Sequence, residues 1–519
     1  MKSTTLVFIV FSFITNVAFA SWQEDLTNLI KTDNDKTKKD LITKIVSAKP
    51  ELKDIIELIK SQKFNHGENG NFVEKEIMCV DGKKRPYIIY IPKSYDPSIK
   101  TPMIVNLHGA VTWPMKDKKK RLKHAKSQEV TELAIKNNWF IVFPFGEASA
   151  TWWDNVGQSN VLNIIRETKR NYNIDDEKLW MTGFSDGASG SFQFAMTKPT
   201  DFAALFPLCG DMGVGAQDGG NHLYPSNMSN LPLYVINTDE DYIYPSSRMI
   251  KTIDMAREAG ANIFYKEYNG FGHDFNFSAE ELPRLERYFK RNSRNSIPHH
   301  LQWKTAQEEF STLFWLKINE VADGDRATWH KDFNTKLLDE SVAFGFIPEQ
   351  GFEGNGVKVA KVNEGDNLSN RLGLKNNDIV IRCNETEISN LKDIKTFKDS
   401  IKRGDFVRAS VLREGNEVLL EGRHPEPKKY DVFPRTLTSG AIVADFRANT
   451  FDVKTSRVNG FSIYLHPDMI QLDQDVVIMT EGKELYRSKV TPDIAFMLNN
   501  FLENRDRELL YYKKIDIDL

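Results

Sequence analysis

Cysteine is scarce in this chain of 519 residues, which contains only three. An odd number cannot pair completely, so at least one cysteine stays unpaired, and we expect Cys79, Cys209 and Cys383 to be buried thiols. The histidines and cysteines also lack any spacing typical of a metal site. We therefore predict a protein that works without a metal or another cofactor.

An excess of charge of either sign is also lacking. The chain carries 69 basic and 72 acidic residues, a net charge of −3. This balance argues against a nucleic-acid partner and against strong attraction to a membrane surface. Beyond the first twenty residues no apolar run is long enough to span a bilayer, so we expect no membrane partner. The length suits about three domains, and a hydrophobic content of 40% is sufficient for packed cores.

The first twenty residues have the pattern of a secretory signal peptide. Lys2 supplies a basic start, residues 6–14 an apolar stretch, and Ala18-Phe19-Ala20 a small-residue cleavage site. We predict export to the periplasm or the medium, with removal of residues 1–20. Because Ser21 rather than a cysteine follows the cut, a lipoprotein anchor is not expected.

The run from Trp180 to Gly190 contains the pattern G-x-S-x-G, with Ser185 between Gly183 and Gly187. An apolar strand candidate precedes it and a helix-compatible segment follows. This is the context of a nucleophile elbow, in which a sharp turn lifts a serine hydroxyl clear of a sheet. Ser185 is therefore the candidate nucleophile.

A candidate acid and a candidate base follow downstream, each after a strand candidate. The loop after Leu231–Asn237 contains Asp241, which we expect to be the acid, although Asp239 and Glu240 are alternatives. A later loop, 269–275, contains His273 among glycines. A neutral imidazole can take the proton of a serine hydroxyl, and a carboxylate can hold that imidazole in the required tautomer. The order Ser, Asp, His predicts a catalytic triad.

Two further sets of residues are candidates around the nucleophile. A strand candidate from Thr101 ends in His108-Gly109-Ala110, and the backbone N–H groups of Ala110 and Asp186 are the expected oxyanion hole. Trp152 and Trp153 offer aromatic planes that suit sugar rings or aromatic acyl groups, so they are candidates for substrate binding, the alternative being ordinary core packing.

Residues 72–289 resemble the secreted polyhydroxybutyrate-depolymerase and feruloyl-esterase branch of the α/β-hydrolases. The matching segments are the Asp81–Pro92 opening, Ala150–Asp154, Asn173–Asp175 and Asp201–Gly210, besides the elbow. The resemblance implies a doubly wound α/β sheet and a serine esterase that acts on carboxylic esters of plant polysaccharides or hydroxyalkanoates. Ala110, Asp186 and the pair Asn237-Thr238 depart from the usual residues of this group, and an acidic side chain beside the nucleophile would disfavour anionic substrates unless it points away.

Residues 341–423 resemble a PDZ domain of the bacterial secreted-protease type. Phe344-Gly345-Phe346 matches its carboxylate-binding loop, in which backbone N–H groups capture the carboxylate of a peptide C-terminus. Further matches are Gly356–Val362, Asn370–Ile381 and the helix candidate 391–401. The resemblance implies peptide binding, and a rigid spacer that shapes access to the catalytic unit is the alternative.

The last ninety residues alternate apolar and polar positions in short runs, which predicts a small antiparallel β module. Residues 314–318 have the same character, so we expect the PDZ unit to interrupt a β-sandwich. The expected order is a signal peptide over 1–20, a helical segment over 21–66, an α/β-hydrolase catalytic domain over 67–297, a connector with the first β strand over 298–340, a PDZ domain over 341–427 and a β module over 428–519.

These expectations combine into an exported serine esterase that forms an acyl-enzyme on Ser185. Two alternatives stay open. The first is a serine peptidase on the same α/β scaffold, which the PDZ match superficially favours. The second is a protein without catalytic activity that binds partners through its PDZ and β modules.

Overall fold

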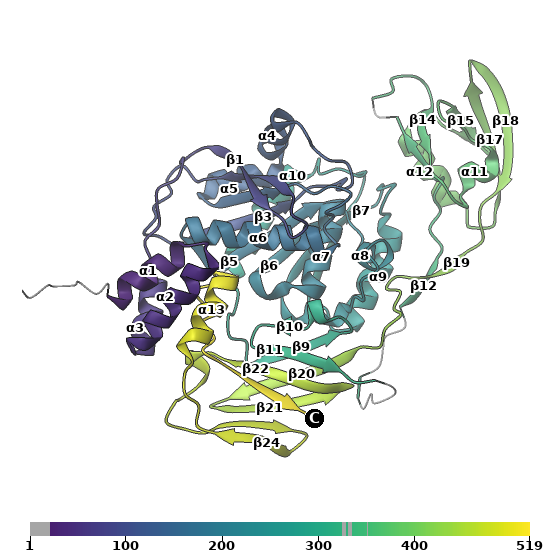
Figure 1. Cartoon of the computed structure of the whole chain (residues 1–519). Coiled ribbons are helices and arrows are strands. Elements are labelled where there is room, and N and C mark those ends of the chain that lie inside the picture. The colour runs from purple at the N-terminus through teal and green to yellow at the C-terminus, as the bar shows by residue number, and fades with distance from the viewer. Residues whose placement is uncertain (1–20, 324–328, 331–334, 350) are drawn as a thin grey trace, which may run out of the picture.

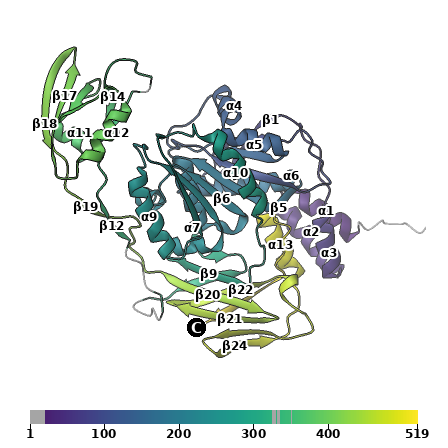
Figure 2. The same ribbon diagram turned by 180° about the vertical axis from the view of Figure 1, so that it is seen from behind.

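The computed structural model describes residues 21–323, 329–330, 335–349 and 351–519. A central unit built on one large sheet packs against a β layer, helices from the start of the chain lie beside both, and a smaller module stands away from the central unit on a narrow stem (Figures 1 and 2). The predicted signal peptide, residues 1–20, lies outside the described residues. Among the helices of the described part, none is both long and apolar enough to cross a membrane.

The central sheet has eight strands in the order β1-β2-β4-β3-β5-β6-β7-β8. The pairs β1–β2 and β2–β4 are antiparallel, and every other neighbouring pair is parallel. The strands are β1 (Phe72–Met78), β2 (Lys84–Tyr90), β3 (Thr101–Leu107), β4 (Phe140–Pro144), β5 (Ile174–Phe184), β6 (Ala204–Leu208), β7 (Leu233–Thr238) and β8 (Ile263–Tyr268).

Alternate residues of these strands pack into two separate cores. In β4, for example, Phe140 and Val142 face one core, and Ile141 and Phe143 face the other. All five residues of β4 are buried, as expected for a strand covered on both faces of its sheet. Helices α6 (Asn155–Asn171), α7 (Asp186–Thr197) and α9 (Ser246–Glu258) cover the first face, and α4 (Lys118–Ser127), α5 (Glu129–Asn137) and α10 (Ser278–Arg291) cover the second. The predicted α/β class is confirmed.

The β layer consists of two sheets that enclose a core of their own. One sheet has the order β10-β11-β22-β25 and the other β24-β23-β21-β20-β9, so strands from both sides of residues 341–427 share each sheet. The strands are β9 (His300–Thr305), β10 (Thr312–Leu313), β11 (Leu316–Val321), β20 (Gly440–Arg447), β21 (Thr450–Ser456), β22 (Val458–Leu465), β23 (Val476–Thr480), β24 (Lys483–Ser488) and β25 (Lys513–Asp518).

Residues 21–66 contain the helices α1 (Trp22–Lys31), α2 (Asp35–Ser47) and α3 (Leu52–Lys60). Their apolar faces join the core of the β layer together with α13 (Ile494–Asn504), beside which they lie in Figure 1. They therefore pack far from the predicted nucleophile. The remaining short turns are α8 (Val214–Gln217), η1 (Pro199–Asp201), η2 (Pro225–Asn230), η3 (Glu308–Phe310) and η4 (Pro467–Met469).

Charged groups are buried where the β layer meets the central unit. Asp506 binds Lys169 and Arg294 at 2.9 and 2.7 Å, and Asp176 binds Lys169 and Arg507 at 3.1 Å each. All five side chains are at most 3% exposed. We call these five residues the buried charge network. A buried charge is tolerable only when it is paired, so each member depends on the others.

The smaller module contains the sheet β13-β14-β15-β17-β18, with β16 paired to β15 and two helices beside it. Its elements are β13 (Phe346–Pro348), β14 (Val357–Val362), α11 (Leu368–Leu372), β15 (Ile379–Cys383), β16 (Thr386–Glu387), α12 (Leu391–Ser400), β17 (Phe406–Arg413) and β18 (Asn416–Arg423). Sixteen buried residues form its separate core. The capping box of Asn390 and Asp393 starts α12.

A two-stranded ribbon, β12 (Lys336–Asp339) with β19 (Lys428–Asp431), forms the stem of the module. Directly after β19, Val432 and Phe433 are buried in the core of the central unit. The stem is therefore rooted in the central unit although the module itself is not.

Candidate active site

Ser185 lies between the last residue of β5 and the first residue of α7, with φ +58° and ψ −121°. A positive φ is costly for a residue with a side chain and marks a site where the surroundings impose it. The turn also needs its two glycines. A Cβ on Gly187 would lie 2.0 Å from the carbonyl oxygen of Leu107, and one on Gly183 would lie 2.3 Å from the carbonyl carbon of Gly187. The G-x-S-x-G pattern thus forms a tight strand–turn–helix elbow with a half-buried serine.

The three residues predicted as a triad are brought together. The hydroxyl of Ser185 lies 2.9 Å from Nε2 of His273, and Nδ1 of His273 lies 2.7 Å from Oδ2 of Asp241. Oδ1 of Asp241 accepts the backbone N–H groups of Ile243 and Tyr244, each at 2.8 Å. Because the carboxylate is held at both oxygens, it can orient the imidazole so that Nε2 is free to accept a proton.

The structure also separates Asp241 from the alternative acids. Asp239 accepts the backbone N–H of Gly270 and pairs with Lys395, and Glu240 lies in a cavity beside the smaller module. In this structure neither contacts His273. Strand β7 ends at Thr238, so the backbone of the following turn sets the direction of the side chains of residues 239–241. The spacing of these residues in the sequence did not reveal those directions.

The loop proposed for the oxyanion hole lies against the elbow. A Cβ on Gly109 would be 3.1 Å from Cβ of Ser185, and Ala110 has a φ of +49°. The carboxylate of Asp186 accepts the N–H of Val111 at 2.8 Å, which ties this loop to the elbow. Because Asp186 begins α7, its own N–H has no partner within the helix. The role of Ala110 and Asp186 stays a prediction, and these contacts agree with it.

His108 connects the same loop to the segment that follows β4. Its Nδ1 lies 2.7 Å from the carbonyl oxygen of Gly109, and its Nε2 accepts the N–H of Gly146 at 3.0 Å. Burial lowers the pKa of His108, so the ring is neutral, with the proton on Nδ1 donated to Gly109. The His-Gly sequence alone did not reveal that His108 supports this loop, because its partner Gly146 lies 38 positions away in the chain.

The prediction that Trp152 binds substrate is wrong. Its side chain is fully buried, its indole N–H donates to the carbonyl oxygen of His108 at 2.9 Å, and it packs against Gly190. Trp152 therefore supports the oxyanion loop from inside the core. Trp153 is 7% exposed and belongs to the same core, and its contact with substrate stays a prediction.

Sequence reasoning missed the aromatic surroundings of the base. The ring of Phe184 lies 4.7 Å from that of His273, and those of Tyr242 and Tyr244 lie 6.1 and 5.9 Å away. Phe184 and Tyr242 are the chain neighbours of the predicted serine and acid, and Tyr244 lies three positions after the acid, so closeness in the chain was the available signal. They shield the imidazole, whose side chain is 9% exposed.

No group of three or more histidine, cysteine, aspartate or glutamate side chains is arranged to hold a metal ion within the described part of the chain. Cys79, Cys209 and Cys383 are buried and unpaired with one another, as expected from the odd count. Burial raises the pKa of the Cys209 thiol, which makes it a poor nucleophile.

No family model matches the chain. Among curated proteins, a bifunctional acetylxylan esterase/xylanase of Neocallimastix patriciarum is 27% identical over 138 residues, which is 26% of this chain and 19% of that protein. The chain thus spans about a fifth of the length of this relative.

Similar solved structures include a thermostable esterase, with 22% identity and a TM-score of 0.35 over 43% of this chain and 63% of the other. A putative dipeptidyl aminopeptidase IV from Bacteroides ovatus also has a TM-score of 0.35, with 16% identity over 43% and 36%. The feruloyl esterase module of Clostridium thermocellum has a TM-score of 0.32, with 16% identity over 45% and 94%. TM-scores this low carry no argument about function.

Proposed function

We propose that the chain is a serine hydrolase that cleaves carboxylic esters. The observation that carries this proposal is the contact series Ser185 Oγ to His273 Nε2 at 2.9 Å and His273 Nδ1 to Asp241 Oδ2 at 2.7 Å. A scaffold without activity would have no need for a serine held at positive φ with a base and an oriented acid in line.

In the first half-reaction Oγ of Ser185 attacks the ester carbonyl while His273 takes its proton. The negative charge that develops on the carbonyl oxygen meets the N–H groups of Ala110 and Asp186. The tetrahedral intermediate then breaks its bond to the alcohol, which leaves with the proton from His273. The acyl group remains on Ser185 as an ester.

In the second half-reaction His273 takes a proton from a water molecule, which attacks the acyl carbon. The acid is released, and the proton returns to Oγ of Ser185. Asp241 stabilises the imidazolium in both halves. Every proton and electron pair is accounted for by these three side chains and water.

We further propose carbohydrate-linked feruloyl or acetyl esters, or hydroxyalkanoate esters, as the substrate class, and export as the setting. The resemblance of residues 72–289 and the similarity to the acetylxylan esterase/xylanase of Neocallimastix patriciarum support this choice. The carboxylate of Asp186 is engaged by Val111.

The smaller module is proposed to be a PDZ domain that binds a peptide C-terminus through the backbone of Phe344, Gly345 and Phe346. Gly345 has φ +85°, the two phenylalanine side chains are buried, and β13 is an edge strand of its sheet. An edge strand can accept an extended ligand. Fluorescence anisotropy with peptides that end in a free or an amidated carboxylate tests this, and equal binding of both would contradict it.

Burst kinetics with 4-nitrophenyl acetate test the esterase proposal. We expect a burst of one nitrophenolate per active site and a loss of at least about 10³-fold in kcat for Ser185→Ala. Ser127→Ala, at an exposed position on α4, is the matched control and should behave as the unaltered protein. Turnover that survives Ser185→Ala would refute the proposal.

A side-by-side panel of feruloyl, acetyl-xylan, methyl-uronate and hydroxybutyrate esters, with the matching amides, then separates substrate classes. We expect esters to be cleaved faster than amides. A clear preference for amides would favour the peptidase alternative instead.

A further inference from the structure

Helix α12 of the smaller module contacts the loop that carries the catalytic acid. Nζ of Lys395 lies 2.6 Å from Oδ2 of Asp239 and 4.0 Å from a carboxylate oxygen of Glu240. The side chain of Lys395 is 33% exposed and that of Asp239 14%, so the pair is shielded but not dry. These contacts join two units that otherwise have separate cores.

Asp239 also binds the loop that carries the catalytic base. Its Oδ1 accepts the N–H of Gly270 at 2.7 Å, while its Oδ2 faces Lys395. Asp239 lies two residues before the catalytic acid, and Gly270 three residues before the catalytic base. The backbone N–H of Glu240 also donates to the carbonyl oxygen of Phe271 at 3.0 Å. One carboxylate thus connects the module with both catalytic loops.

The charges support a permanent contact at neutral pH. Burial opposes ionisation of Asp239, but hydrogen bonds from Lys395 and Gly270 outweigh it and hold the pKa of Asp239 below its usual range. The hydrogen bond to Asp239 likewise raises the pKa of Lys395. Both groups are therefore charged under the conditions in which an imidazole base works.

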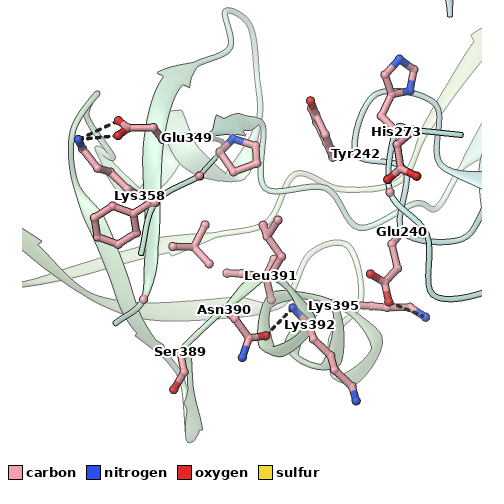
Figure 3. A pocket seen from close by; sticks show the side chains of 18 of the residues that line it. Glu240, Tyr242, His273, Glu349, Lys358, Ser389, Asn390, Leu391, Lys392 and Lys395 are labelled. Atoms are coloured by element: carbon pink, nitrogen blue, oxygen red, sulfur yellow. Dashed lines mark hydrogen bonds and ion pairs between the residues drawn. The ribbon is translucent and has the colours of Figure 1, made fainter. Parts of the chain in front are cut away.

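A cavity of about 740 Å³ lies beside this contact and is lined by both units. Figure 3 shows Glu240, Tyr242 and His273 on one side of it, and Glu349, Lys358, Asn390 and Leu391 on the other. Ser185 is not among its lining residues. His273 is among them, so the module faces the loop that carries the base across this cavity.

We propose that Lys395 is a positioning residue for hydrolysis, acting through Asp239 on the loop that carries His273. This inference rests on the proposed function. It makes the smaller module a part of the catalytic apparatus, in addition to any ligand that the module binds. A base displaced by a fraction of an ångström loses much of its effect, so the contact matters for rate more than for binding.

The test compares Lys395→Met with the unaltered protein in 4-nitrophenyl acetate hydrolysis and in the rate at which a fluorophosphonate labels Ser185. We expect kcat, kcat/KM and the labelling rate to fall about tenfold while KM stays within twofold. The reason is that the lost ion pair positions the base in the transition state and does not bind the substrate. Lys395→Arg should retain at least half of the activity. Lys361→Met, at an exposed position on β14 away from the cavity, is the matched control.

Coupling separates positioning from general damage to the module. In the Asp239→Asn background, Lys395→Met should change kcat by less than twofold, because the partner is already lost. A tenfold further loss there, or activity of Lys395→Met within twofold of the unaltered protein, overturns the inference while leaving the esterase proposal intact. Absence of labelling and turnover that depend on Ser185 in the unaltered protein would instead refute the proposed function and this inference with it.

Discussion

Ion pairs attach both neighbours of the central unit, but those to the β layer are buried and the one to the smaller module is partly exposed. The β layer is joined through the buried charge network, in which Asp506 is fully buried between Arg294 and Lys169. The smaller module is joined at its tip by Lys395 and Asp239, which water still reaches. The first junction is part of the folded core, whereas the second can be broken without exposing apolar surface. Ion pairs of similar length therefore serve stability in one place and function in the other.

The largest expected effect comes from breaking the buried junction. Asp506→Asn removes the charge that compensates Arg294 and Lys169, so we expect the free energy of unfolding to fall by about 3–5 kcal/mol. Urea denaturation followed by tryptophan fluorescence measures it. Asp239→Asn, at the partly exposed junction, should cost less than about 1 kcal/mol. Equal costs for the two variants would remove the distinction.

Val432 and Phe433, at the root of the stem, are buried in the core of the central unit. We therefore expect a substitution there to lower the free energy of unfolding about as much as one in the buried charge network. Phe433 is fully buried in the core of the central unit, so Phe433→Ala should lower the free energy of unfolding by about 3 kcal/mol through the cavity it leaves. Leu437→Ala, at an exposed position a few residues later, is the control and should change it by less than about 0.5 kcal/mol. A small effect at residue 433 would show that the stem is not rooted.

Removal of the whole module separates its contribution to stability from its contribution to rate. Asp339 and Lys428 are paired across the ribbon, so an Asn-Gly turn can join them directly and delete residues 340–427. We expect the remainder to fold, with its melting temperature within a few degrees, because the other cores stay complete. The labelling rate of Ser185 should fall about as far as in Lys395→Met, roughly tenfold. Full activity of the shortened chain would speak against any catalytic part for the module.

Acid should affect the buried junction more strongly than the tip. Burial opposes ionisation of Asp506, but the charges of Arg294 and Lys169 outweigh it and depress its pKa in the folded state. A depressed pKa contributes stability that is present above the unfolded value near 3.9 and is lost as the pH falls below it. The free energy of unfolding should therefore fall between about pH 4 and pH 2, and less steeply in Asp506→Asn. An unchanged slope in that variant would contradict the assignment.

The smallest effect is expected from salt. At 1 M ionic strength the screening length is about 3 Å, so the partly exposed Lys395–Asp239 pair should weaken while the buried charge network is little affected. We expect kcat to fall by about twofold in the unaltered protein and to stay constant in Lys395→Met. Parallel salt curves for both proteins would mean that the pair does not act on rate.

The sequence was sufficient to predict the sheet class and to name three residues that the structure brings within hydrogen-bond distance, because each follows a strand and the chain order restricts the choice. It was not sufficient to separate Asp241 from Asp239, since the direction of a side chain in a turn depends on backbone angles that the pattern does not encode. Trp152 failed as a substrate residue for a similar reason. An aromatic residue after a loop can face either way, and here the close approach of Gly190 draws it into the core.

Contacts between distant segments were beyond the reach of sequence reasoning altogether. Lys395 and Asp239 lie 156 positions apart, and no pattern in the sequence links the two segments that carry them. Val432 and Phe433 follow a polar strand and have no pattern that assigns them to the core of another unit. Such contacts depend on how complete units meet, which local propensity and periodicity do not determine.

The position of Asp506 has a consequence for how the chain is made. Its partners Lys169 and Arg294 lie 337 and 212 positions earlier, so Asp506 can join them only when nearly the whole polypeptide has been made. The joint between the central unit and the β layer can close only after that point. A product that ends before residue 506 thus leaves Arg294 without its carboxylate partner, although Lys169 keeps Asp176, and cellular proteases can distinguish such a product from the finished molecule.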